Sequence, residues 1–189
     1  MVDPFETLGI PPAFDLDLTA VEKRYRELAR VLHPDRYVGG SPAERRMALG
    51  KAVEVNEAWR LVRDPIRRAE ALLRRRGVRI EEGKEPKAAP EFLMEMMEQR
   101  EALSEAKMSG DAAAVERLAN AIYDRQKDVT ARIAAALAPP QSGSAASGET
   151  SLDHVVSLLG ELRYYRRFLD EVSAIQDGFS ERPHTASNN

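Results

Sequence analysis

The chain has 189 residues, of which 43% are hydrophobic and 31% charged, with a net charge of −3. The absence of cysteine excludes disulfides, thiolate nucleophiles and cysteine-ligated metal sites within the chain. The three histidines are too scattered for a metal cluster, the acidic balance disfavours nucleic acid, and no apolar run nears the roughly 20 residues of a membrane span. We therefore expect a cytoplasmic protein without a signal peptide, membrane contact, metal or other cofactor.

The charge is divided unevenly along the chain. Residues 1–80 carry a net charge of +4, whereas residues 81–189 carry −7. Such an asymmetry indicates two modules that face different partners.

The N-terminal part reads as short helices with clear start signals. A cap residue, a proline and a glutamate recur in Asp3-Pro4-Phe5-Glu6 and in Ser41-Pro42-Ala43-Glu44, and Asp64-Pro65 begins another helix. Thr19-x-x-Glu22 is a weaker start, before an apolar face that continues to Leu32. The helix from Pro65 stops at Gly77, so we expect a first domain over residues 1–77, with Tyr25 and Trp59 in its core.

The C-terminal part reads as three longer helices. They cover Glu91 to about Ser109, Asp111 to about Leu137, and Ser151 to about Gln176 after a weak Thr150-x-x-Asp153 start. Proline, glycine and charge make residues 78–90 a linker, residues 139–150 a mobile loop, and residues 179–189 a disordered tail. We therefore predict an all-α chain, with a small helical domain followed by a three-helix bundle over residues 91–178.

A single loop motif in the first domain stands out. His33-Pro34-Asp35 falls where the first strong amphipathic helix ends, because proline disfavours helical geometry at the residue before it. Exposed basic residues are expected at intervals of three and four before it (Lys23, Arg26, Arg30), and Arg36 follows. Alone, the tripeptide is also typical of an ordinary turn, and the stripe of a solvated helix face. His33 and Asp35 lack a nucleophile or metal that would make them a catalytic pair.

In this context the chain resembles the J-domain of the DnaJ superfamily, and more closely the HscB-type co-chaperones of iron–sulfur cluster assembly. The match covers residues 3–107 well and 152–172 loosely. The segments that carry it are Pro4–Ile10, His33–Tyr37, Val55–Trp59, Asp64-Pro65, Arg68–Leu73, Gly77, Phe92–Glu95 and Arg100-Glu101. The resemblance implies a J-domain, an antiparallel helical hairpin with short flanking helices, and a C-terminal three-helix bundle.

The resemblance implies an adaptor rather than an enzyme. J-domains stimulate the ATPase of a DnaK/HscA-type chaperone, so His33, Pro34 and Asp35 would be the trigger. Lys23, Arg26, Arg30 and Arg36 would steer docking onto an acidic chaperone surface, since basic side chains on one face raise encounter rates. We expect the protein itself to be a monomer.

The same resemblance assigns the iron–sulfur cluster scaffold protein to the bundle. The helix from Glu91 has more apolar residues than one buried face needs; we expect Phe92, Met96, Leu103 and the stem of Arg100 to be buried. The contact residues implied by the family are Leu93, Met94, Met97, Glu98, Glu101, Glu105 and, from a looser alignment, Tyr164. Tyr164 and Phe168 are expected off the core side, and Tyr165 or Phe168 remain alternatives for the aromatic contact.

Three other functions are compatible with parts of the pattern. A general J-protein would use the bundle to grip unfolded clients, and a regulatory protein would carry a degenerate J-domain. The run Arg74-Arg75-Arg76 suggests nucleic-acid binding as a third alternative, but this run has few aromatic neighbours and precedes an acidic bundle.

Overall fold

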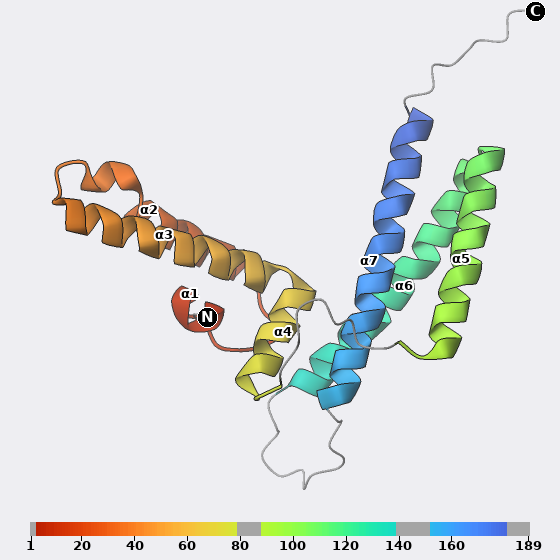
Figure 1. Ribbon diagram of the computed structural model, residues 1–189, viewed down its shortest axis with the longest axis horizontal. Coiled ribbons are helices and arrows are strands. Elements are labelled where there is room, and N and C mark those ends of the chain that lie inside the picture. Colours follow the sequence, from red (N-terminus) through yellow and green to blue (C-terminus); the bar gives the residue numbers. More distant parts are fainter. Residues whose placement is uncertain (1–2, 79–87, 139–151, 181–189) are drawn as a thin grey trace, which may run out of the picture. The chain divides into compact units, whose positions relative to one another are not determined.

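The computed structural model describes residues 3–78, 88–138 and 152–180 (Figure 1). These residues form seven α-helices and one 3-10 helix, with no strand among them, which confirms the all-α prediction. The chain divides into two units, residues 1–81 with 134–152, and residues 82–133 with 153–189. Most of the predicted linker, the whole predicted loop, its Thr150 cap and the tail beyond residue 180 lie outside the described residues.

The helices of the first unit begin where side chains cap their free amides. The unit contains α1 (Pro4–Leu8), α2 (Leu18–Val31), the 3-10 helix η1 (Pro34–Tyr37), α3 (Pro42–Arg63) and α4 (Pro65–Arg75). Asp3 and Asp64 each accept two backbone N–H bonds, and Ser41 forms a reciprocal capping box with Glu44. The cap of α2 is Asp17 rather than the predicted Thr19, because its carboxylate accepts the N–H groups of Thr19 and Ala20.

The core of the first unit forms around α3, which packs against α1, α2 and α4. Phe5, Leu8, Val62 and Leu73 are fully buried there. Tyr25 and Trp59, predicted as core, are instead half-buried. Their rings stack 5.4 Å apart, and the Tyr25 hydroxyl donates to Asn56 at 3.0 Å, which explains why the pair stays at the edge of the core where polar atoms find partners.

The second unit contains α5 (Pro90–Ser109) and nearly all of two further long helices, α6 (Ala112–Leu137) and α7 (Leu152–Ser180). Gly110 ends α5 in the left-handed region at φ 71°. Ion pairs join α5 to its neighbours, from Glu95 to Arg125 of α6 at 2.6 Å and from Arg100 to Glu171 of α7 at 3.6 Å. None of the described helices is both long and apolar enough to cross a membrane.

One position of the bundle differs clearly from the sequence prediction. Of the stripe expected on α5, Met96 and Leu103 are buried and Phe92 is half-buried, while the Arg100 side chain, of which only the stem was expected to be buried, is 54% exposed and pairs with Glu171. Phe168 was expected off the core side of α7 and is fully buried. The helix also continues through Phe179 and Ser180, whose hydroxyl donates to the Gln176 carbonyl at 3.1 Å, so these two residues of the predicted tail are helical.

Candidate functional site

The His33-Pro34-Asp35 turn has a defined local geometry. Helix α2 ends at Val31, and His33 caps η1 with extended backbone angles. Its Nδ1 accepts the backbone N–H of Asp35 at 3.3 Å, and the same nitrogen lies 3.5 Å from Asp35 Oδ2. Proline fixes one backbone angle between these residues and has no N–H to satisfy. The Arg36 N–H adds a bond to the His33 carbonyl at 3.0 Å, so the turn is stabilised largely by bonds among its own residues.

The imidazole and the carboxylate of this turn point into solvent. The side chains of His33 and Asp35 are 59% and 85% exposed. Two weak bonds brace the loop behind them, from the Tyr37 hydroxyl to the Val31 carbonyl and from Arg45 to the Val38 carbonyl, both at 3.4 Å. A braced turn with an exposed imidazole and carboxylate is suited to contact with a macromolecule.

The predicted basic residues lie on α2, which leads into this turn, and on η1. Lys23, Arg26, Arg30 and Arg36 are all exposed. Arg26 pairs with Glu22 at 2.6 Å, whereas no carboxylate of the described residues lies within salt-bridge distance of Lys23 or Arg30. The face thus carries positive charge that an acidic surface would complement.

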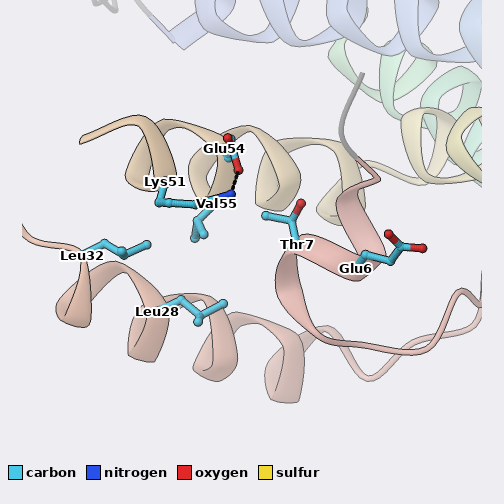
Figure 2. Close-up of a pocket in the computed structure, with 7 residues that line it drawn as sticks. All are labelled: Glu6, Thr7, Leu28, Leu32, Lys51, Glu54 and Val55. Atoms are coloured by element: carbon cyan, nitrogen blue, oxygen red, sulfur yellow. Dashed lines mark hydrogen bonds and ion pairs between the residues drawn. The ribbon is translucent and has the colours of Figure 1, made fainter. Parts of the chain in front are cut away.

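The first unit also has a pocket between α1, α2 and α3 (Figure 2). Leu28, Leu32 and Val55 form its apolar part, and Lys51 and Glu54, paired at 2.7 Å, lie at its α3 side. Glu6 and Thr7 of α1 complete the lining. Neither His33 nor Asp35 lines this pocket, and the described residues contain no group of three His, Asp or Glu that could hold a metal.

In the second unit, α5 presents the predicted acidic, methionine-rich surface. Met94 and Met97 are 63% and 71% exposed, and Leu93 is half-buried beside them. Three carboxylates are exposed on the same side of the helix, those of Glu98, Glu101 and Glu105. Exposed apolar groups edged by charge are typical of interaction sites.

One aromatic side chain of α7 contacts α5 and stays partly exposed. Tyr164 is half-buried and meets Phe92 of α5 edge-on, with ring centroids 5.6 Å apart. The guanidinium of Arg167 lies 4.5 Å from the Tyr164 ring centre, a contact that reasoning from sequence missed although the spacing of three residues permits it. Tyr165 is buried, and burial raises its pKa to about 12. Since Phe168 is buried too, Tyr164 alone of the three candidates retains exposed surface.

Two family models match the chain, one in each part. A model described as the DnaJ domain matches residues 3–71, and one described as the HSCB C-terminal oligomerisation domain matches residues 88–173. Together they include the His33 turn, its basic stripe and the α5 surface.

Curated relatives and solved structures agree with these matches. A co-chaperone protein HscB homolog of Bordetella petrii is 38% identical over 135 residues, covering 71% of this chain and 78% of the relative. The HscB homolog of Shewanella oneidensis is 32% identical over 174 residues, covering 92% and 96%. The structure of chaperone HscB from Vibrio cholerae has a TM-score of 0.80 at 27% identity, covering 94% of this chain and 99% of that one. Human HscB shares the fold, with a TM-score of 0.80 at 23% identity.

Proposed function

The chain belongs to the HscB family, the J-domain co-chaperones of iron–sulfur cluster assembly, and we propose that it works as an adaptor with one surface for each of two partners. The first surface is the chaperone-binding surface: His33, Pro34, Asp35, Lys23, Arg26, Arg30 and Arg36. The second is the scaffold-binding surface: Leu93, Met94, Met97, Glu98, Glu101, Glu105 and Tyr164. The proposal includes a monomer that acts in the cytoplasm and catalyses no reaction itself.

The observation that supports this proposal best is the exposed, self-braced turn at His33 next to basic side chains. An acidic face on a DnaK/HscA-type chaperone would be attracted by Lys23, Arg26 and Arg30, and the attraction would raise the association rate. The imidazole of His33 and the carboxylate of Asp35 would then contact the chaperone and promote hydrolysis of its bound ATP.

The scaffold-binding surface would supply the second half of the function. Met94 and Met97 offer adaptable apolar side chains, and Tyr164 adds a rigid aromatic ring braced by Phe92. A chain that binds both partners raises the local concentration of the scaffold at the chaperone. Scaffold and co-chaperone should therefore stimulate ATP hydrolysis synergistically.

The decisive experiment is a steady-state ATPase assay with a DnaK/HscA-type chaperone, with and without the cluster scaffold protein. His33→Gln should abolish stimulation while leaving the thermal melt unchanged, because the side chain is exposed. The matched control is His154→Gln, an exposed histidine of the other unit, which should stimulate normally. Normal stimulation by the His33 variant would refute the chaperone-binding surface.

The scaffold-binding surface is tested in the same assay. Met97→Ala combined with Glu101→Ala should weaken scaffold binding and lose synergy, yet preserve the stimulation measured without scaffold. If binding were unchanged, the scaffold site would lie elsewhere. If the wild-type chain instead suppressed aggregation of denatured proteins and showed no preference for the scaffold, the general J-protein function would replace this one.

A further inference from the structure

Met108, near the end of α5, is the most exposed large hydrophobic side chain among the described residues, at 78%. It is not part of the scaffold-binding surface as defined above. Burying an exposed methionine side chain against a partner is energetically favourable, so Met108 is suited to be a contact residue.

The helical register places Met108 on the same side of α5 as that surface. At 100° per residue, the 11 positions from Met97 to Met108 return to within about 20° of the same direction. The rise along the helix over this interval is about 16 Å. Met97 and Met108 are therefore two apolar points on one stripe.

Three carboxylates lie along one flank of the stripe between these two points, whereas the exposed cations of the same stretch, Arg100 and Lys107, lie on the other flank. Glu98, Glu101 and Glu105 are spaced three and four residues apart, and all three are exposed. No cation of the described residues forms a salt bridge with them. Like charges at this spacing destabilise a helix, so the arrangement has a cost in the free protein that a basic partner would remove.

We propose that the scaffold-binding surface extends along α5 to Met108, so that the scaffold must offer two apolar contacts separated by basic side chains. This inference rests on the proposed function and specifies the partner's chemistry. The apolar contacts are Met94 with Met97 at one end and Met108 at the other. The carboxylates between them pair with lysine or arginine of the scaffold.

A second copy of this chain fits the stripe less well. A two-fold contact brings the same patch of both copies together. The carboxylates of Glu98, Glu101 and Glu105 would then face their own counterparts, which is repulsive. A basic, non-identical partner has no such penalty.

Methionine methyl groups provide a direct probe in the full-length chain. The chain has six methionines. With ¹³C-methyl methionine, purified cluster scaffold protein should shift or broaden the signals of Met94, Met97 and Met108. The signal of Met47, 64% exposed on α3, is the surface control, and that of the buried Met96 reports on the integrity of the fold.

Calorimetric titration with the same scaffold protein measures how much each apolar contact contributes to the affinity. Met108→Ala should raise the Kd at least about fivefold, as expected for an apolar anchor that becomes buried. Met47→Ala should leave it unchanged. Because Met108 is exposed, the melting temperature of its variant should equal that of the parent chain.

The outcomes distinguish this inference from the proposed function. If Met97→Ala weakens binding but Met108→Ala does not, and the Met108 methyl is unperturbed, the extension is overturned while the scaffold-binding surface stands. If neither variant weakens binding, the surface itself fails. A dimer by light scattering that Met108→Glu dissociates would assign the stripe to a second copy and overturn the inference.

Discussion

At the scale of single residues, Arg68 is the least expected feature of the first unit. It is a charged side chain with only 7% exposure. One guanidinium nitrogen donates to the Val62 carbonyl at 2.8 Å, and the group lies 4.9 Å from the ring centre of Phe14. Burial lowers the pKa of Arg68, while Asp64 and Asp15 oppose that shift. Arg68 thereby joins α4 to the end of α3 and to the segment before α2.

Arg68→Lys should therefore destabilise the chain although charge is retained. An ammonium cannot stack as a flat group on Phe14 while donating to Val62, so we expect a loss of about 1 kcal/mol or more in the free energy of unfolding. Urea denaturation followed by circular dichroism measures this. The control is Arg67→Lys, an exposed neighbour on α4 that should cost little. Equal stabilities for the two variants would show that the Arg68 contacts contribute nothing.

The structural role of a residue can be predicted from the sequence where its physical cause is local. Asp3, Ser41 and Asp64 cap helices because their side chains lie next to the amides they satisfy. The role is harder to predict where two neighbouring residues could both cap a helix, or where tertiary contacts decide which side chains are buried. Asp17, and not Thr19, caps α2. Arg68 lies in the segment Arg68–Leu73 that resembles the family, but nothing in the sequence indicates that its charged side chain is buried.

At the scale of elements, α7 shows why helix faces are harder to predict than helices. Its existence follows from apolar spacing, but its buried stripe changes direction along the helix. Val155 and Leu159 are buried at the start, whereas Phe168 and Ile175 are buried further on, at a different angle about the axis. Leu162, Tyr165 and Phe168 are buried at steps of three residues, and each step falls about 60° short of a full turn, so extrapolation from Leu162 at 3.6 residues per turn misplaces Phe168.

Helix α7 also contains a carboxyl group, that of Glu161, whose ionised form is disfavoured by burial. Burial raises the pKa of Glu161, and the repulsion from Asp128 adds to it, whereas Arg132 and His154 oppose the shift. A raised folded-state pKa means that the fold favours the protonated form. The stability due to that preference is complete below the unfolded pKa and is lost as pH rises through the folded one. Above its folded-state pKa the ionised Glu161 thus disfavours folding.

Glu161→Gln should accordingly raise the melting temperature at pH 7, with a gain that shrinks towards zero near pH 4. There the wild-type side chain is largely protonated in both states. Melting curves of both proteins between pH 4 and pH 8 measure the difference. Asp170→Asn, at an exposed carboxylate of the same helix, serves as the control variant. A lower melting temperature for Glu161→Gln at pH 7 would mean that Arg132 and His154 outweigh burial.

At the scale of the whole molecule, the sequence predicts two modules and the charge of each. The helix-start signals and the family segments give the J-domain and the bundle, both of which the comparisons match. What the sequence does not give is which charges are already paired. Arg26 is held by Glu22 and Arg125 by Glu95, so the number of charged residues in a module overstates how many charges are free to meet a partner. The carboxylates of the α5 stripe and the cations of Lys23 and Arg30 form no ion pair with another described residue, so these are the charges that we expect a partner to meet.

Replacing Lys23, Arg26 and Arg30 by alanine should therefore affect one partner and not the other. We expect the association rate with the chaperone to fall about tenfold at low salt, and its salt dependence to flatten, because the basic stripe steers encounter. The Kd for the scaffold should stay constant. Stopped-flow association at several salt concentrations and calorimetry measure the two effects.

Combining these replacements with Met97→Ala tests whether the two surfaces act independently. The two surfaces share no residue and belong to different units. For each partner measured alone, the change in binding free energy of the combined variant should therefore equal the sum of the changes caused by the separate replacements. Only the synergy in the ATPase assay should fall by more than either change predicts, because it requires both partners at once. A chaperone association rate that depended on Met97 in the absence of scaffold would show that the surfaces are coupled and that the chain is more than a passive adaptor.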